Sequence, residues 1–438
     1  MRTDFRETRA TTVRWWIVAM LMGWAILGHF NRLSIAVAGN ERFIREGLID
    51  EQRMGLVYSM FLIAYTCCML PAGIFIDRYG PTASLTWMGL AMGLGVALTG
   101  TLGWLGWSGA QLWWGLMVVR GLAGIGSTPL HPAAARSISL WIPRPSQTLA
   151  NGLVTAGALL GIAASYPVFG WLMDRLDWPL AFVVSGGTMV AAAIAWRCCA
   201  ADHASEHRWS NEQEACCVPR DHLPRQLTIG AALREFVQHF RNRSLLLLSL
   251  SYGAVGYFQY LFFYWIEYYF DTTLHMPTEV SRRSSSLVML AMALGMASGG
   301  GLASLASRRW GLATGRRTLA IGGMLLSSLF AFGGVRASEP DLVVAWFCLA
   351  LGVLGMSEGV FWTTVTDLGG RTGGLAAAFL NTWGNATGAI APWLTALIMQ
   401  RYGWDAAIGF ACLLCALGGL LWLAFNPAQA APAGTAVV

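Results

Sequence analysis

Charged residues are scarce in this chain, and lysine is absent. Of its 438 residues, 55% are hydrophobic and only 12% are charged, and all 29 basic residues are arginines. So few charges do not keep a protein of this size soluble, and the composition therefore predicts a membrane protein with many apolar helices. The arginines are spread over short loops, which excludes the basic groove that a nucleic-acid partner needs.

Sequence patterns of metal, cofactor and enzyme sites are also missing. The cysteines show no spacing typical of secreted disulfides. The adjacent pairs Cys198-Cys199 and Cys216-Cys217 lack the spacing of structural zinc ligands, although histidines nearby leave a zinc site open as the alternative to reduced thiols. No phosphate-binding loop or nucleophile elbow occurs, so we expect no metal, no cofactor and no enzyme activity. The first apolar run is too long for a cleavable signal peptide.

Long apolar runs predict an all-α membrane protein with twelve transmembrane helices. With both termini placed in the cytoplasm, the cytoplasmic segments hold more than twice as many arginines as the outer loops, as the positive-inside rule requires. We therefore expect a multi-pass protein of the plasma (inner) membrane, embedded in the lipid bilayer. The predicted helices cover residues 14–38, 53–76, 82–103, 111–135, 147–172, 178–197, 244–270, 284–306, 314–335, 341–366, 373–400 and 404–425.

A polar segment divides the predicted helices into two sets of six. The sequence predicts an N-terminal six-helix bundle at 1–197, a cytoplasmic linker loop at 198–243 and a C-terminal six-helix bundle at 244–438. Arg175-Leu-Asp-Trp178, before the sixth helix, is repeated as Arg401-Tyr-Gly-Trp404 before the last helix. Two parallel repeats with a site between them form one large class of transporters. The alternative is that the two arginine–tryptophan pairs only anchor unrelated helices at the interface.

Two arginines are predicted to lie inside helices. Arg32 falls in the first predicted helix and Arg120 in the fourth. A charge within the bilayer costs about 2.5–3.5 kcal/mol, so a functional role is expected. A guanidinium group binds a carboxylate through two hydrogen bonds, and we therefore predict that Arg32 and Arg120 bind an anionic substrate. The alternatives are that Arg32 extends to the membrane interface and that Arg120 forms a structural ion pair.

The turn between the second and third predicted helices resembles the signature loop of the major facilitator superfamily, Gly-x-x-x-Asp-Arg-x-Gly. The matching positions are Gly73, Asp77, Arg78 and Gly80. The resemblance implies the major facilitator fold and a turn that latches onto a neighbouring helix during the conformational change. Residues 299–309 resemble the same loop, with Ser304 in place of the acid. The alternative is an ordinary basic cytoplasmic turn.

Within that superfamily the chain resembles the anion:cation symporters, which include carriers of hexuronate, galactonate, tartrate, phthalate and sialic acid. Four motifs, in order, carry this resemblance: Gly28–Arg32, Arg120–Pro132, Tyr257–Trp265 and Asn381–Gly388. The resemblance implies acids for proton coupling in the first and fourth helices, but Asn31 and Ser127 stand at those positions. Neither side chain takes up a proton at physiological pH, so coupling has either moved or is absent.

Other side chains are candidates for a displaced proton site. Glu358 lies inside the tenth predicted helix, and His29 lies one turn before Arg32. An anion that displaced an arginine from Glu358 would link proton binding to anion binding, whereas a fixed salt bridge with an arginine is the alternative. His131 lies between two prolines and is expected to make a structural hydrogen bond. Glu267 is expected at the outer membrane interface.

A polyhydroxy acid also needs polar partners and an aromatic wall. Besides His29, the candidates for these contacts are Tyr65, Gln259, Trp362, Asn381 and Asn385. For the aromatic residues among them, ordinary packing is the alternative.

The residues and the resemblance together predict a secondary active transporter of a small organic anion, with sugar acids favoured. It would work by alternating access as a proton-coupled symporter, and it is expected to be a monomer. One alternative is an uncoupled uniporter or exchanger of organic anions. Another is a membrane sensor that binds the anion without transporting it. The sequence does not identify the anion.

Overall fold

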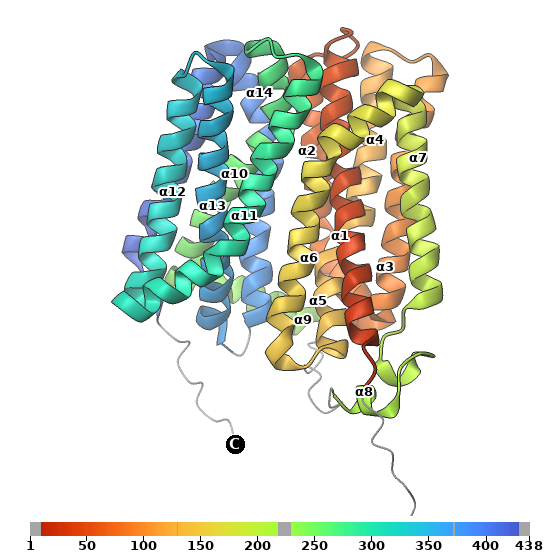
Figure 1. Cartoon of the computed structure of the whole chain (residues 1–438), viewed down its shortest axis with the longest axis vertical. Helices are drawn as coiled ribbons and strands as arrows, with labels where there is room; N and C mark the ends of the chain where they lie inside the picture. The colour runs from red at the N-terminus through yellow and green to blue at the C-terminus, as the bar shows by residue number, and fades with distance from the viewer. Residues whose placement is uncertain (1–9, 129, 218–228, 371–372, 429–438) are drawn as a thin grey trace, which may run out of the picture.

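The computed structural model describes residues 10–128, 130–217, 229–370 and 373–428. In these residues the regular secondary structure is helical throughout, as predicted (Figure 1). Some residues on which the predictions rest lie outside the described ranges. They are Pro129 of the Arg120–Pro132 motif, linker residues 218–228, and Arg2, Arg6, Arg9 and Arg371, which were counted among the cytoplasmic arginines.

The helices form two groups that stand side by side in Figure 1. The N-terminal helices, on the right, are α1 Val13–Ala38, α2 Glu51–Cys67, α3 Met69–Thr101, α4 Gly109–Ser127, α5 Leu130–Trp141, α6 Arg144–Ala164 and α7 Gly170–Cys199. The C-terminal helices, on the left, are α10 Arg243–Tyr268, α11 Thr278–Trp310, α12 Leu312–Arg336, α13 Pro340–Gly369 and α14 Gly373–Leu420. Short turns extend several of them: η1 Gly39–Ile44, η2 Leu102–Leu105, η3 Ser165–Phe169, η6 Tyr269–Thr273 and η8 Leu421–Ala424.

Eight helical segments of the described chain are long and apolar enough to cross a bilayer. They are Val13–Ile44, Pro71–Leu105, Leu149–Cys199, Arg243–Thr273, Thr278–Trp310, Leu312–Arg336, Pro340–Gly369 and Gly373–Ala424. An all-helical membrane architecture is therefore confirmed, whereas the count of twelve stays a prediction. Two predicted boundaries also differ, because the helix expected at 53–76 is interrupted at Cys68 and the one expected at 111–135 is divided between α4 and α5.

Four helix breaks share one unusual backbone geometry. Gly80 within α3 and Gly311 between α11 and α12 have φ of 82° with ψ of 163° and 156°. Asp177 within α7 has φ 61° and ψ 162°, and Gly403 within α14 has φ 80° and ψ 175°. Glycine adopts this conformation readily, whereas an aspartate there carries a cost of about 1–3 kcal/mol. The breaks therefore occur at matching places in the two helix groups.

Packing within the two groups is also matched. In the N-terminal group α1 packs on α6 and α2 on α4, while in the C-terminal group α10 packs on α14 and α11 on α13. The two groups meet through α2 against α14 and α6 against α11. Gly55 lets α2 approach closely, because a Cβ atom there would lie 2.8 Å from the Pro392 carbonyl oxygen. Glycine at such a contact allows two helix backbones to touch.

The linker contributes one piece to each group. Its first piece, with η4 Ala204–Glu206 and α8 Glu212–Cys216, lies against the N-terminal helices: the Thr82 amide donates to Asp202 (2.8 Å) and the Arg14 amide to Glu214 (2.9 Å). Its second piece, α9 Ile229–His239, packs on α14 through Phe236 and Phe379, whose rings lie 5.2 Å apart. We call this end of the bundle, the lower one in Figure 1, the linker end and the opposite one the far end.

Contacts between the two groups gather at the far end. Glu51 accepts hydrogen bonds from Tyr268 (2.8 Å) and Gln400 (3.0 Å), and Arg45 lies 3.8 Å from Asp271. Arg282 of α11 binds two carboxylates of the N-terminal group. The described residues therefore hold the bundle together at its far end.

Candidate functional site

Arg32 lies between the two helix groups. Its guanidinium donates to the Tyr260 hydroxyl of α10 (2.5 Å), and its Cζ lies 5.4 Å from the centre of the Phe61 ring and 5.6 Å from that of Tyr65. The side chain is half-buried and forms no ion pair with any described residue. Its described contacts are aromatic or neutral, and they place it well inside α1 rather than at the helix end.

Arg120 of α4 is completely buried beside Arg32. One of its nitrogens donates to the Arg32 carbonyl oxygen (2.8 Å), whereas Nε and Nη1 have no hydrogen-bond partner. Its Cζ lies 4.6 Å from the Phe61 ring centre, so the guanidinium groups of Arg120 and Arg32 both contact the same phenyl ring. No ion pair links Arg120 to any described acid, and the predicted alternative of a structural ion pair is therefore not found there.

Tyr260 connects this arginine pair to the C-terminal helices. Its hydroxyl accepts from Arg32 and donates to Oδ1 of Asn385 on α14 (3.2 Å). Asn385 in turn donates to the side chain of Asn381 (3.0 Å). Asn381 and Asn385, both predicted substrate contacts, are thus joined to Arg32 through Tyr260, which was not among the predicted site residues.

Two glycines of the Asn381–Gly388 motif make room for tyrosines. A Cβ atom on Gly388 would lie 2.2 Å from the Tyr260 ring, and one on Gly384 would lie 2.7 Å from the Tyr252 ring. Both are far below normal contact distances, so only glycine fits. The motif therefore seats the two aromatic rings whose hydroxyls reach the candidate site.

Glu358 of α13 is held by neutral donors. Tyr252 donates to one carboxylate oxygen (2.6 Å), as does Trp362 (3.3 Å), and Gln259 donates to the other (3.3 Å). The predicted residues Gln259 and Trp362 therefore gather around Glu358. None of the ion pairs of the described residues includes Glu358, so this structure contains neither the fixed salt bridge nor the arginine that an arriving anion was expected to displace from Glu358.

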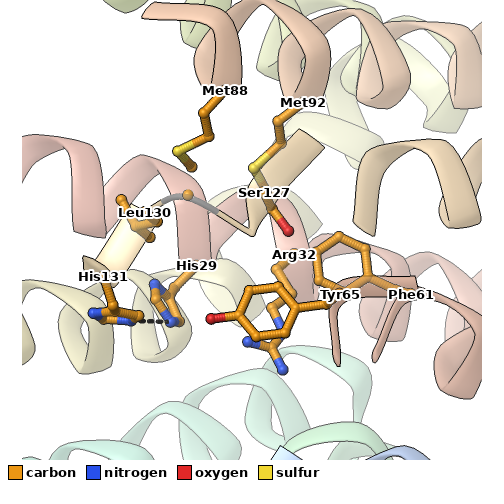
Figure 2. Close-up of a pocket in the computed structure, with 10 residues that line it drawn as sticks. His29, Arg32, Phe61, Tyr65, Met88, Met92, Ser127, Leu130 and His131 are labelled. Carbon is orange, nitrogen blue, oxygen red and sulfur yellow. Dashed lines mark hydrogen bonds between the residues drawn. The ribbon is translucent and has the colours of Figure 1, made fainter. Parts of the chain in front are cut away.

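His29 and His131 form a pair beside Arg32 in a small cavity (Figure 2). Their Nε2 atoms are 3.4 Å apart, and Nδ1 of His29 lies 3.0 Å from the Ala25 carbonyl oxygen. His29 therefore donates from Nδ1 and accepts from His131, since a carbonyl oxygen only accepts. The Tyr65 hydroxyl points toward this pair in Figure 2, and Ser127 lines the same cavity. The structural hydrogen bond expected for His131 is thus made with His29.

Asn31 and Ser127, which stand where the resemblance implies acids, both have hydrogen-bond partners in the N-terminal helix group. Asn31 donates to the Leu27 carbonyl and accepts from Ser185 on α7 (2.7 Å), so its amide is engaged within the N-terminal group. Ser127 donates to the Gly124 carbonyl one turn before it (3.0 Å). Neither side chain contacts the arginine pair through a hydrogen bond of the described chain.

The signature turn lies within α3, which is bent at Gly80, and the positive φ of Gly80 favours glycine. A Cβ atom there would also lie 2.1 Å from the Asp202 carboxylate of the linker. Arg78 is exposed and lies over the neighbouring Tyr79 ring (5.3 Å), and Asp77 is exposed at the same turn. Gly73 has open space around its Cα. The predicted latch to a neighbouring helix stays a prediction.

Within the described residues, no group of three histidine, cysteine, aspartate or glutamate side chains could hold a metal ion. The zinc alternative for the linker therefore has no such ligand set there. In the linker, His207 lies 2.8 Å from the Cys199 carbonyl oxygen, and both cysteine pairs are free thiols.

Comparison with curated proteins finds organic-acid transporters across nearly the whole chain. It is 23% identical to a D-galactonate transporter of Escherichia coli O6:H1, over 94% of this chain and 95% of that protein. It is 25% identical to a probable sulfoacetate transporter of Cupriavidus necator, over 92% and 91%. It is also 23% identical to a hexuronate transporter of Bacillus subtilis, over 96% of each chain.

Solved structures show the same fold. A bacterial homologue of the human lysosomal transporter Spinster, in an inward-facing occupied conformation, superimposes with a TM-score of 0.72 at 14% identity, covering 95% of this chain and 97% of that one. The family model of the Major Facilitator Superfamily matches residues 10–374. The relatives are transporters of the anion:cation symporter type, as the sequence motifs indicated. The chain therefore belongs to the major facilitator superfamily of membrane transporters.

Proposed function

We propose that this protein carries a small organic anion, of the sugar-acid class, across the membrane by alternating access. The observation that carries the proposal is the arginine pair, Arg32 and Arg120, which has no acidic partner in the described chain. Two cations in an apolar interior attract an anion strongly, and a guanidinium group binds a carboxylate through two hydrogen bonds. Arg120 has two nitrogens without a partner for this purpose.

The contacts around Arg32 suit alternating access, because they cross between the helix groups. Arg32 belongs to the N-terminal group, while Tyr260, Asn385 and Asn381 belong to the C-terminal group. An anion bound to Arg32 and to these polar groups would draw the two groups together. Hydroxyl groups of a sugar acid would replace or extend the hydrogen bonds among the asparagines. The relatives named for galactonate and hexuronate support this substrate class.

We propose twelve membrane passes in two six-helix bundles, 1–197 and 244–438, joined by a cytoplasmic linker. Leu149–Cys199 has 51 residues and Gly373–Ala424 has 52, more than twice the length that one pass needs, and each contains a break. Two passes in each, together with α2 and the α4–α5 pair, bring the eight segments to twelve. The linker end then faces the cytoplasm, so the far-end contacts would close the outer side of the plasma membrane.

We further propose that transport is coupled to protons through Glu358 or His29. Both are buried and both can carry a proton. Glu358 lies near Tyr260, which contacts Arg32, and His29 lines the same cavity as Arg32. The second candidate is an uncoupled carrier or exchanger. It is favoured by Asn31 and Ser127, whose side chains are satisfied by their own helix group and do not titrate.

The test is uptake by proteoliposomes that contain the purified protein and a pH-sensitive dye. The panel holds hexuronates, aldonates, aldarates and aromatic acids. We expect saturable uptake of a sugar acid, accompanied by proton movement. In Arg32→Gln we expect anion uptake to fall at least thirtyfold, since removing one partner of a buried charge pair costs about 2 kcal/mol or more. Arg283→Gln is the matched control, because that side chain is 80% exposed at the far end.

Three other outcomes have distinct meanings. Anion uptake without proton movement would favour the uncoupled carrier. Saturable binding that needs Arg32 but gives no uptake or exchange would identify a sensor. Uptake that Arg32→Gln leaves unchanged would contradict the assigned site.

A further inference from the structure

The far end holds a buried ionic contact that joins the two helix groups. The Arg282 guanidinium of α11 makes two hydrogen bonds to Glu41 of η1, both 2.6 Å, and two to Asp174 of α7, at 2.5 and 2.9 Å. Arg282 and Glu41 are buried. Gly170 makes room for this contact, because a Cβ atom there would lie 2.3 Å from Nε of Arg282. One cation thus binds two carboxylates of the opposite group.

A third carboxyl group, Glu267 of α10, is buried against this contact without a donor. Its side chain is 2% exposed, and neither carboxyl oxygen has a hydrogen-bond partner. It meets the Glu41 carboxylate, which belongs to the opposite helix group and is itself occupied by Arg282. Glu267 therefore lies at the far end but is buried in protein, so a place at the membrane interface is wrong, whereas the assignment of this end to the outer side stays a prediction.

The surrounding charges do not neutralise Glu267. The titratable and charged groups that face Glu267 are Glu41, Asp271, Arg282, Tyr58 and Tyr166. Its partners are in turn faced by Asp174, Arg42, Arg45 and His275. Arg282 is already shared by Glu41 and Asp174, and Arg45 lies 3.8 Å from Asp271. Two ionised carboxylates in contact inside a protein repel each other strongly, and such pairs hold a shared proton instead.

We propose that Glu267 and Glu41 share a proton when the far end is closed, so that the pair is a proton-binding site of the outer closure. With the proton on Glu267, its hydroxyl donates to Glu41, and the carboxyl group that lacks a partner becomes a hydrogen-bond donor. This also leaves Glu41 free to keep its two bonds to Arg282.

Proton binding at this pair is linked to the conformation of the carrier. Glu267 and Glu41 belong to different helix groups, so opening the far end separates them and exposes Glu267 to water, where a carboxyl group ionises. The closed form therefore binds one more proton than the open form, and acid favours closure while alkali favours opening. The link to transport rests on the proposed function, but the proton site itself does not, since it involves no substrate.

The first test measures the far-end distance by electron spin resonance. Spin labels are placed on Ser108→Cys and Ser338→Cys, two exposed loop positions, one in each helix group, after the native cysteines are replaced. In the purified protein without anion, we expect the open fraction to rise with pH, by at most about tenfold per pH unit for one proton. In Glu267→Gln, which resembles the protonated acid, the distances stay short at every pH. Glu279→Gln, an exposed acid at the same end, should behave like the wild type.

The second test detects the proton itself. Infrared difference spectra between the wild type and Glu267→Gln should contain the C=O stretch of one protonated carboxyl group at neutral pH, a signal that a purely structural role would not give. Absence of that band, or a wild-type distance distribution independent of pH, would overturn the proposal. The proposal would also be overturned if the Glu267→Gln protein eluted as a folded protein and its spin-label distances still changed with pH as in the wild type. None of these readouts requires an anion, so failure of the transport assay would leave them interpretable.

Discussion

Glu358 is held by three neutral donors, and this arrangement makes its role testable at the scale of one residue. Tyr252, Trp362 and Gln259 surround the carboxylate without a counter-cation. Glutamine has the same shape and can accept the bonds from Tyr252 and Trp362, while a rotated Gln259 amide can accept from the new amino group. Glu358→Gln should therefore fold.

For Glu358→Gln we expect anion exchange to survive and anion-driven proton movement to be lost, because the side chain no longer takes up a proton. The measurement is counterflow of labelled anion and internal pH in the same proteoliposomes. Glu339→Gln, at an exposed acid that precedes α13, is the control. Proton movement that persists in Glu358→Gln would shift attention to His29.

Single residues in the site were predictable where their chemistry conflicts with a membrane. Arg32, Arg120 and Glu358 stand out because a charge in an apolar run is costly. Tyr260 and Tyr252 did not stand out, because tyrosines are common in such helices, and their hydroxyls matter only through partners more than a hundred residues away. Glu267 was misplaced for the same reason: its neighbour Glu41 lies in the other half of the sequence.

At the scale of a helix, Gly388 on α14 determines where Tyr260 sits. A Cβ atom would meet the tyrosine ring at 2.2 Å, so Gly388→Ala should push the ring from Arg32 and Asn385. Overpacking of this kind costs about 1–3 kcal/mol. We expect a lower thermal unfolding midpoint and anion binding weakened by about tenfold. Gly374→Ala is the matched control on α14, because no atom lies within 4 Å of its Cβ position. Equal effects in both variants would contradict the role assigned to Gly388.

Helices were predictable from apolar length, but their interruptions were less so. The repeated Arg-x-x-Trp pattern placed Asp177 and Gly403 at equivalent positions, and both have the same extended, positive-φ backbone. The break at Cys68 was not predicted, although Pro71 follows three residues later and has no N–H to donate to the Cys67 carbonyl. Asp177 adopts this positive-φ backbone although it is not glycine. Its carboxylate accepts a hydrogen bond from the Trp178 amide (2.8 Å) and lies 3.7 Å from Arg42, and both contacts stabilise it there.

For the whole molecule, Arg282 is the cation that joins the two helix groups through Glu41 and Asp174 at the far end. Its replacement leaves Glu41 buried without a cation, and breaking a buried pair in this way costs about 3–5 kcal/mol. We therefore expect Arg282→Gln to favour the open far end at every pH in the spin-label measurement, the opposite of Glu267→Gln. Arg283→Gln, next to it but exposed, should leave the distances unchanged. A closed far end in Arg282→Gln would show that the contacts of Glu51 suffice for closure.

The family was accessible from short motifs, whereas the conformational state of the carrier was not. Motifs and hydropathy predict which helices form. Because the sequence is the same in every conformation, these features do not indicate which conformation the protein adopts. The closed far end depends on pairs such as Glu51 with Tyr268 and Arg282 with Glu41, which form between distant segments. No local pattern distinguishes these from ordinary loop charges.

The two site arginines lie in one helix group, and this has an electrical consequence. If that group rocks as a body, the bound anion and its counter-charges move through the membrane field together. A dianion would cancel both guanidinium charges, whereas a monoanion would leave one positive charge to move, worth up to about 2.3 kcal/mol per 100 mV. The charge displaced in the loaded step would therefore depend on the valence of the substrate, whereas the current of a full cycle, in which the empty group carries the arginine charges back, equals the substrate charge plus that of any coupled proton.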